Sequence, residues 1–517
     1  MEDGEADSKC IACLRQGWSQ PSDDASAQGA TTVKGSNASS LPCTAVDWTC
    51  TGSSVVAAYG ATNEAGWSRH RGGVASWNLM RRSFDAAAPA TSKPDHVIEY
   101  HTSVMAVACH PEHPSLIAGG SFLGEVVVWD TNREDTEVAR STIDEAIHRE
   151  SITSLQWFKD LYTGQSHLLA SLSSDGRLNI WSMANKLAAP VQAFRLTPPG
   201  RLTDKHTVLG GASMSFFQGS SGASGFVVGT EGGAVLRCSR HSGLTGKLPS
   251  PSAAEEPVSM EGSSLPWHPA AAAYVRSLPA AAKTRLVRHV ETHAHGSGAA
   301  LVDLPCIFAA RPDPEMAFPS PAVFRHAPHS GPVRGCSASP FHRALFATGG
   351  QDGRVCVFSS LLRQPPLVLE PVPASVGYNH VGAVAWSRKR PFVLAAGGGD
   401  GMLHLFDLLA SPSAPVLSLP PAVYGETAGG SSQSSRAVAM AGGGGGNAAQ
   451  ASHQGILSVA FNPKLGKLVA CGDSTGALRV WRLGWGLSEE QPNEAAQLGQ
   501  YMRLVVSGGA DDSTATA

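Results

Sequence analysis

Residues 171–181 read SLSSDGRLNIW: a short apolar run, an Asp-Gly pair, and an alternating run that ends on Trp181. Asp-Gly between two strand-like runs is a strong signal for a β-hairpin, because both residues tolerate the left-handed backbone of a tight turn. A single hairpin is at best marginally stable in water. The fold therefore depends on whether the chain repeats this unit.

Six further stretches follow the same plan of apolar strand, glycine-containing turn and alternating strand. They read VVAAYG…GGVASW (55–77), LIAGGSFLGEVVVW (116–129), FVVGTEGGAVLRC (226–238), LFATGGQDGRVCVF (345–358), LAAGGGDGMLHLF (394–406) and LVACGDSTGALRVW (468–481). Each is preceded by one more apolar strand, for example CTAVDW (43–48) or ITSLQW (152–157). Seven copies of a multi-stranded unit are typical of WD40 propeller blades.

The repeats predict an all-β fold, a seven-bladed WD40 β-propeller. Blades packed face to face bury the apolar faces that one small sheet would leave in water. We expect structural roles for Asp175, Asp352 and Asp400 at hairpin turns. We expect the same for the aromatic residues that end the third strands, most of them tryptophans packed between blades: Trp77, Trp129, Trp181, Phe358, Phe406 and Trp481.

Changes in composition indicate the domain boundaries. We expect a flexible N-terminal tail at 1–40, the propeller at 41–486, and a C-terminal tail at 487–517. In that tail, 487–505 is expected to form a short helix with Ser488 as its N-cap. Two insertions, 241–325 and 411–452, are rich in small and polar residues. Within the first, 271–295 is compatible with a helix that has a basic side, and the second is expected to be disordered.

The bulk composition excludes several classes of protein. The formal net charge is -3, so no strong overall field attracts nucleic acid or acidic lipid. The acidic start MEDGEADSK does not resemble a secretory signal, and the chain has no run of about 18 apolar residues that would span a membrane. Five of the ten cysteines lie inside apolar strand-like runs, where a free thiol behaves as a small hydrophobe: Cys109, Cys238, Cys336, Cys356 and Cys471. We expect no nucleic-acid partner and no membrane insertion.

Three groups of residues suggest chemistry, and each has a simpler interpretation. Cys10 and Cys13 are half of a zinc motif without a second half. The stretch HVETHAH holds three histidines, but it lies in an insertion and lacks the Glu position of a zincin: His289, His293 and His295. The glycine run 442–446 has no P-loop lysine. We therefore expect no metal and no cofactor. His329 and His453 precede first strands, but neither follows a glycine, so we expect only weak internal hydrogen-bond networks there.

Four segments resemble the WD-repeat intermediate chains of dynein, most closely those of cytoplasmic dynein 2. They are GTEGGAVLRCS (229–239), HSGPVRGCSASPFHRALFATGGQDGRVCVFSSLLRQPPL (329–367), RPFVLAAGGGDGMLHLFDL (390–408) and ACGDSTGALRVWRL (470–483). The Cys-Ser ending of the first segment and SPFHR (339–343) are more specific than the general WD40 pattern.

The resemblance implies a non-catalytic scaffold subunit that supports retrograde intraflagellar transport and cilium assembly. Its propeller would bind the tail of the dynein heavy chain, and a region before the propeller would pair with a second intermediate chain and recruit light chains. It implies a location in the cytoplasm and cytoskeleton, at the ciliary axoneme and basal body. Residues 1–40 contain no Thr-Gln-Thr motif of the kind that light chains take up as an added strand, so that motif gives no support for light-chain binding here.

Propellers commonly bind partners through the loops of one face. We expect heavy-chain contact at the ring of residues that precede the first strands: His101, Thr102, Glu150, Ser151, Ser330, Gly331, Asn379, His380, Gln454 and Gly455. The alternative is a WD40 adaptor that recognises another protein or peptide, such as a substrate adaptor of a ubiquitin ligase. An enzyme is not expected, because no acids or histidines repeat at channel-facing positions.

Overall fold

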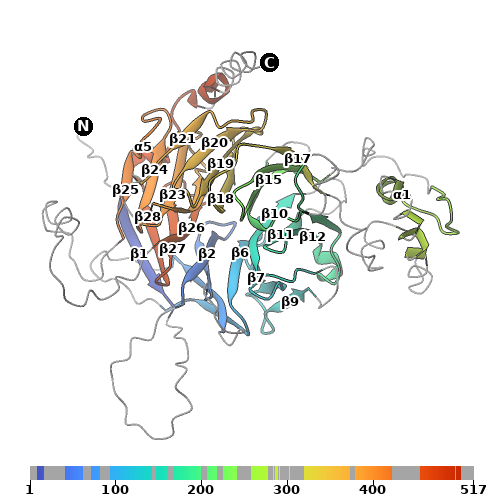
Figure 1. The fold of residues 1–517 in the computed structure, drawn as a ribbon. Coiled ribbons are helices and arrows are strands. Elements are labelled where there is room, and N and C mark those ends of the chain that lie inside the picture. Colours follow the sequence, from blue (N-terminus) through green and yellow to red (C-terminus); the bar gives the residue numbers. More distant parts are fainter. Residues whose placement is uncertain are drawn as a thin grey trace, which may run out of the picture.

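The computed structural model describes residues 8–16, 41–61, 71–81, 93–141, 147–159, 167–199, 207–217, 225–240, 258–276, 283–284, 286–288, 290–291, 302, 320–372, 379–421, 455–494 and 496–501. These residues form seven antiparallel four-stranded sheets, the blades of a closed ring (Figure 1). The prediction of an all-β, seven-bladed WD40 propeller is confirmed.

The blades are numbered 1 to 7 by their first strands, which contact one another around the ring. The first strands are β2 (Cys43–Trp48), β6 (Val104–Cys109), β10 (Ile152–Lys159), β14 (Gly211–Phe216), β18 (Val333–Ala338), β22 (Val381–Trp386) and β26 (Ile456–Phe461). The second strands are β3 (Ser54–Tyr59), β7 (Leu116–Ser121), β11 (His167–Ser173), β15 (Gly225–Thr230), β19 (Leu345–Gly350), β23 (Val393–Gly398) and β27 (Leu468–Asp473).

The third and fourth strands complete each blade toward its outer edge. The third strands are β4 (Gly72–Asn78), β8 (Val126–Asp130), β12 (Arg177–Trp181), β16 (Val235–Ser239), β20 (Val355–Ser359), β24 (Leu403–Asp407) and β28 (Ala477–Arg482). The fourth strands are β5 (His96–Tyr100), β9 (Glu137–Arg140), β13 (Gln192–Arg195), β17 (Ala322–Arg325), β21 (Leu367–Leu369), β25 (Leu417–Leu419) and β1 (Lys9–Arg15). A short 3-10 helix, η1 (Met183–Asn185), joins β12 to β13.

The stretch 171–181 forms the hairpin of β11 and β12 in blade 3. Leu169 pairs with Trp181 and Leu172 with Leu178, and the turn lies between them. Gly176 has φ +77°, and a Cβ there would approach the carbonyl oxygen of Leu209 to 2.7 Å. Glycine is therefore required both by the backbone conformation and by the backbone of the segment that packs against the turn.

The aromatic residues that end the third strands pack against the preceding blade. Trp181 is fully buried and shares a cluster with Ala118 and Val128 of blade 2. Trp129 meets Val56 and Val74 of blade 1 in the same way. Because each blade covers the apolar face of the one before it, the core is a ring of seven interfaces around the axis.

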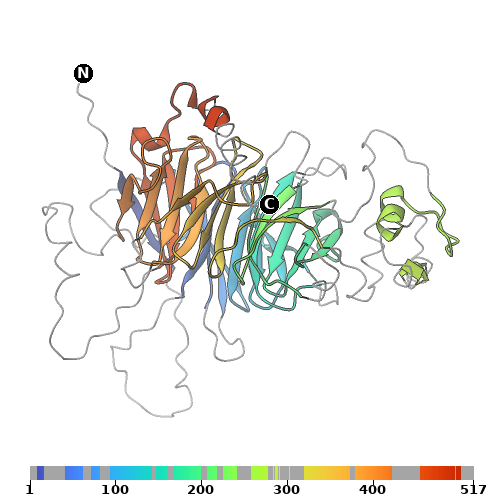
Figure 2. The ribbon, with the colours of Figure 1, turned by 45° about the horizontal axis from the view of Figure 1, so that its top comes forward.

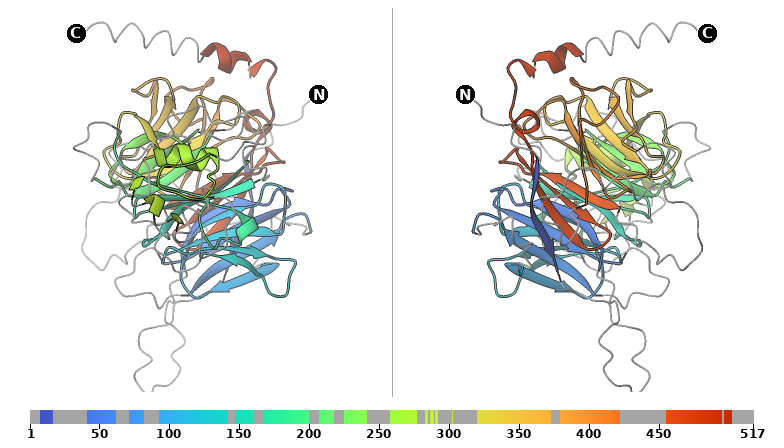
Figure 3. Two further views of the ribbon diagram at one scale, coloured as in Figure 1. Left: turned by 90° about the vertical axis from the view of Figure 1, so that its right-hand side faces the viewer. Right: turned by 90° about the vertical axis from the view of Figure 1, so that its left-hand side faces the viewer.

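The ring is closed by the strand nearest the N-terminus. β1 pairs antiparallel with β28, and Cys13 lies opposite Arg479 and Leu14 opposite Leu478. Figure 3 shows β1, in dark blue, beside the orange-red strands of blade 7. Leu14 is fully buried. The expectation of a flexible tail over 1–40 is therefore wrong for Lys9–Arg15, because its apolar residues complete blade 7.

The two expected insertions contain ordered structure. β17 and β25 lie inside 241–325 and 411–452 and serve as the fourth strands of blades 4 and 6. The first insertion also holds helix α1 (Pro269–Arg276) and a small core of its own around the fully buried Trp267. Figure 2 shows α1, in yellow-green, standing apart from the blades. A low-complexity composition therefore concealed a separate apolar cluster. Residues 422–454 lie outside the described residues.

The C-terminal segment is helical in two pieces. Helix α5 (Trp485–Ser488) follows β28 directly, and residues 494 and 496–501 are also helical. Ser488 ends α5, so its expected role as the N-cap of a helix over 487–505 is wrong. The second helical piece begins after Asn493, whose carbonyl accepts the N–H of Gln497 at 2.9 Å, and just ahead of it the backbone N–H of Gln491 donates to the carboxylate of Glu494 at 3.2 Å.

Candidate functional site

The strand directions define two faces of the ring. The first and third strands of a blade are both antiparallel to the second, so they end on the same side, as the pairing of Trp386 with Leu394 and of Val393 with Asp407 shows in blade 6. We call that side the end face. The opposite side, where the first strands begin, is the start face.

A buried hydrogen-bond network holds the start face of blade 3. His148 Nε2 lies 2.7 Å from Ser171 Oγ, and the indole N–H of Trp181 donates to the same hydroxyl at 2.8 Å. Asp175 accepts the backbone N–H groups of Arg149 and Arg177 at 2.9 and 2.8 Å. Burial raises the pKa of Asp175. Hydrogen bonding to His148 and to these amides lowers the pKa by more than burial raises it, so the net shift is downward.

Blade 5 repeats this network with other residue types. His329 Nδ1 lies 3.0 Å from Asp352 Oδ1, and its Nε2 lies 2.8 Å from Thr348 Oγ1. Asp352 also accepts the N–H of Ser330 at 3.1 Å. The expectation of a weak network at His329 is wrong, because the preceding glycine is not needed for these contacts. His453 lies outside the described residues.

The start-face network has a variant in blade 6. In blade 3, sequence reasoning missed one residue of the network, His148. Asp400 Oδ2 lies 3.3 Å from His404 Nε2, where the histidine comes from the third strand. His148 was missed because 26 residues lie between it and Asp175 in the sequence, and no fixed spacing links such a histidine to the hairpin turn. Its signal, a histidine shortly before the first strand ITSLQW, is visible only after the repeats are aligned.

The predicted ring of contact residues divides into exposed and structural members. His101, Glu150 and Ser330 are exposed, and Ser151, Gly331, Asn379 and His380 are partly buried. Several of the ring also hold turns: Glu150 accepts the Ser173 hydroxyl, and His101 pairs with Glu125 at 3.0 Å. Thr102 and Gly455 are buried, so they cannot meet a partner in this structure. Gln454 lies outside the described residues.

The central channel widens toward the end face into a cavity of about 500 Å³. Its wall is made by the last residues of the first strands. Asp47 accepts the backbone N–H of Cys109 at 2.7 Å and that of Trp48 at 2.8 Å. Burial raises the pKa of the Asp47 carboxyl, against the lowering effect of these amides and of Arg388. One oxygen of Asp47 is thus engaged within its own strand by Trp48, and the other joins blade 1 to Cys109 of blade 2.

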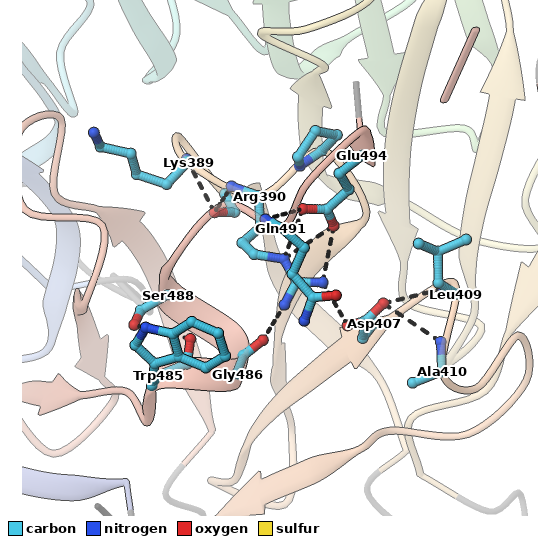
Figure 4. A network of polar contacts seen from close by, with 12 residues as sticks. Lys389, Arg390, Asp407, Leu409, Ala410, Trp485, Gly486, Ser488, Gln491 and Glu494 are labelled. Carbon is cyan, nitrogen blue, oxygen red and sulfur yellow. Dashed lines mark hydrogen bonds and ion pairs between the residues drawn. The ribbon is translucent and has the colours of Figure 1, made fainter. Parts of the chain in front are cut away.

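A second buried polar cluster lies at the end face of blade 6 (Figure 4). The guanidinium of Arg390 contacts Asp407 at 3.0 Å and Glu494 at 2.8 Å, and it also donates to the carbonyl of Gly486. Arg390 and Glu494 are each about 1% exposed. Asp407 in turn accepts the N–H of Leu409 at 3.1 Å. The cluster therefore fixes the C-terminal segment and a loop of blade 6 in one arrangement.

The candidate metal residues lie mostly outside the described part of the chain. His289, His293 and His295 and the glycine run 442–446 are not among the described residues. Cys10 and Cys13 lie in β1, where burial raises the pKa of both thiols, that of Cys10 to about 11. Over the described ranges, no three His, Cys, Asp or Glu side chains gather in a way that could hold a metal ion.

The fold defines a class, the seven-bladed WD-repeat propellers. The family model "WD40: WD domain, G-beta repeat" matches residues 92–130 and 322–359. Each match runs from the fourth strand of one blade through the third strand of the next, so the sequence repeat is offset by one strand from the blade.

Two known proteins are similar to this chain over most of its length. The chain is 29% identical over 470 residues to cytoplasmic dynein 2 intermediate chain 2 of Mus musculus, which covers 89% of this chain and 68% of the mouse protein. It is 28% identical over 476 residues to the Homo sapiens protein of the same name, covering 89% and 69%. The resemblance to WD-repeat dynein intermediate chains of cytoplasmic dynein 2 is confirmed. Among the described helices, none has the length and apolar character to cross a membrane.

Proposed function

We propose that this chain is a non-catalytic scaffold subunit of the cytoplasmic dynein 2 complex. Its propeller binds the tail of the dynein heavy chain, and the assembly supports retrograde intraflagellar transport and cilium assembly. The observation that carries the proposal is the similarity to two dynein 2 intermediate chains over 89% of the chain. The proposed location is the cytoplasm and cytoskeleton, with the ciliary axoneme and basal body.

The structural roles of acidic and basic side chains support the proposal of a scaffold. Asp175 and Asp352 hold hairpin turns, and Arg390 holds the C-terminal segment. The seven-sheet ring is closed by β1, so its faces present loops in fixed relative positions. A rigid ring with loop-bearing faces is suited to binding protein partners.

Two further partners follow from the resemblance, a second intermediate chain and dynein light chains. Within residues 1–40, the apolar residues gather in the stretch SKCIACLRQGWSQ (8–20). Its residues Ala12 and Leu14 are buried in the ring closure. We therefore do not assign a light-chain site to this cluster.

Co-elution tests the proposal directly. The purified full-length chain is mixed with a purified dynein 2 heavy-chain tail fragment and passed over a size-exclusion column. We expect a single complex peak. Separate migration, under conditions in which a known dynein 2 intermediate chain co-elutes with its tail, would reject the proposal. In that case a tagged protein absent from cilia and basal bodies would favour the alternative of a WD40 adaptor, such as a ubiquitin-ligase substrate adaptor.

A further inference from the structure

Exposed apolar side chains recur at one structural position in four successive blades. Each follows the end of a third strand by two or three residues, on the end face. They are Leu361 in blade 5 (66% exposed), Leu409 in blade 6 (48%), Trp485 in blade 7 (69%) and Met80 in blade 1 (56%). Single exposed apolar residues are normal on protein surfaces. Four of them at equivalent positions on neighbouring blades form an arc, which we call the apolar arc.

The end-face loops between the first and second strands, which neighbour the apolar arc, touch one another from blade to blade. A Cβ on Gly466 of blade 7 would lie within 3.0 Å of both Lys389 of blade 6 and the carbonyl oxygen of Ser488. Gly52 of blade 1 is equally close to Asn462 of blade 7, whose side-chain amide donates to the Gly52 carbonyl at 2.8 Å. The surface is therefore continuous from blade 6 to blade 1.

The Arg390 cluster fixes two members of the apolar arc. Arg390 contacts the carbonyl of Gly486, the residue after Trp485, and also Asp407, which holds the N–H of Leu409. In Figure 4 the Trp485 ring and the Leu409 side chain lie on opposite sides of this buried cluster. Their backbones are thus positioned before any partner binds, which reduces the ordering cost of association.

The end face of these four blades is basic, although the whole chain carries a net charge of -3. The described loops hold many exposed cations and few exposed acids. The cations are Arg81, Lys93, Arg343, Arg363, Arg388, Lys389, Lys464, Lys467 and Arg482, and the acids are Asp95, Glu489 and Glu490. A positive field around apolar anchors steers an acidic, amphipathic partner to this surface.

The backbone of these loops leaves little for an added strand to pair with. Internal bonds satisfy the N–H groups of Leu408, Leu483 and Ser360, which donate to Phe392, Lys467 and Ala344. At these positions recognition comes from side chains, as when a helix lays its apolar face on a surface. The proposed function gives this chain a protein partner, so binding to an anionic membrane is an outcome of the test that would overturn the inference.

We propose that the end face of blades 5, 6, 7 and 1 binds an acidic amphipathic helix of a partner protein. The apolar arc contacts the apolar side of that helix, and the surrounding lysines and arginines contact its acidic flanks. This inference deepens the proposed function, on which it rests, because it assigns the heavy-chain tail to the end face. The sequence had favoured the start face, where among described residues the large exposed apolar side chain is Leu123 on the β7–β8 turn.

The test measures binding of the full-length chain to the purified heavy-chain tail at about 50 mM and about 300 mM salt. One variant combines Trp485→Ala with Leu409→Ala, and its control is Leu123→Ala on the start face. A second variant combines Lys389→Glu with Lys464→Glu. Its control combines Arg149→Glu with Arg334→Glu, two exposed cations of the start face. All substituted side chains are exposed, so circular dichroism and melting are expected to match the wild type.

We expect the apolar variant to raise the dissociation constant about tenfold or more, as loss of an aromatic anchor does. The charge-reversal variant should associate more slowly and depend less on salt. Both controls should bind as the wild type does. A wild type that binds the tail while both end-face variants bind equally well would refute the surface and leave the proposed function standing. Weaker binding by the start-face controls instead would place the partner on the start face.

Two other outcomes overturn the inference. A wild-type chain that does not bind the tail refutes the proposed function and the assigned occupant together. Co-sedimentation with phosphatidylserine vesicles that depends on Lys389 and Lys464, without tail binding that depends on them, would make this face a membrane site.

Discussion

Arg390 of blade 6 and Glu494 of the C-terminal segment form a buried ion pair, with Nη2 and Oε1 2.8 Å apart. Asp407 approaches the same guanidinium from β24 at 3.0 Å. The C-terminal segment also buries Leu498 against Phe392 and Leu408 of blade 6. Charge pairing and apolar packing therefore hold a segment that follows the last blade against the blade before it.

Replacement of Arg390 tests how much this pair stabilises the chain. Arg390→Met leaves two buried carboxylates without their cation, and such a loss costs about 3–5 kcal/mol. We expect a matching fall in the free energy of unfolding by urea, together with faster hydrogen exchange over 485–501. Lys389→Met, at the exposed neighbouring position, serves as the control and should change stability little. Unchanged exchange in the Arg390 variant would contradict a clamping role.

Replacement of Asp175 tests the start-face network of blade 3. Asp175→Ala leaves the N–H groups of Arg149 and Arg177 without their acceptor and removes the partner of His148. We expect a loss of about 1–3 kcal/mol in the free energy of unfolding. The folded-state pKa of Asp175 is lowered. Its contribution is therefore present above the unfolded-state pKa and is lost as pH falls through the folded value.

The exposed Asp135 offers a matched control for Asp175. Asp135→Ala should change the free energy of unfolding by less than about 0.5 kcal/mol. Equal effects of the two substitutions in urea titrations would show that the blade 3 network does not stabilise the fold.

Replacement of Leu14 tests ring closure by β1. Leu14 is fully buried in a cluster with Val55 of blade 1 and Val480 of blade 7. Leu14→Ala should cost about 2–5 kcal/mol, since it leaves a cavity where three strands meet. Lys9→Ala, at an exposed position of the same strand, is the control. Thermal melts of both variants check the prediction, and a Leu14 variant as stable as the Lys9 variant would show that β1 contributes little to closure.

Local patterns predicted the blades, whereas long-range pairings escaped prediction. The hairpin at 171–181 lies within eleven residues, so its turn chemistry and alternation are visible together. β1 pairs with a strand about 460 residues away, and nothing in KCIACLR specifies β28 as its partner. The core around Trp267 was hidden because its apolar residues are spread over 258–302 among alanine and proline. The apolar arc likewise appears only when the ends of the third strands are superposed.

The lowered pKa of His110 predicts that the free energy of unfolding depends on pH. Its ring packs against Trp157, His113 and His167, with centroids 4.7 to 5.0 Å apart, and its Nδ1 accepts the N–H groups of Glu112 and His113. Burial, helped by the two neighbouring histidines and opposed by Glu112, lowers the pKa of His110 from 6.5 to about 4. The unfolded chain therefore binds a proton between these pH values that the folded chain does not. Stability contributed by neutral His110 is complete above about pH 6.5 and is lost as pH falls to about 4.

Blade 7 supplies the substitution that tests this. Asn462 occupies the equivalent turn, and its Oδ1 accepts the N–H groups of Lys464 and Leu465 at 2.9 and 2.8 Å. His110→Asn should keep the turn but remove the titrating ring. The fall in unfolding free energy between pH 6.5 and 4 should then shrink by up to about 3 kcal/mol. Urea titrations across this range give the measurement, with the exposed His96→Asn as control. A slope that the His96 variant flattens as much as the His110 variant does would assign the pH dependence to exposed histidines rather than to this buried ring.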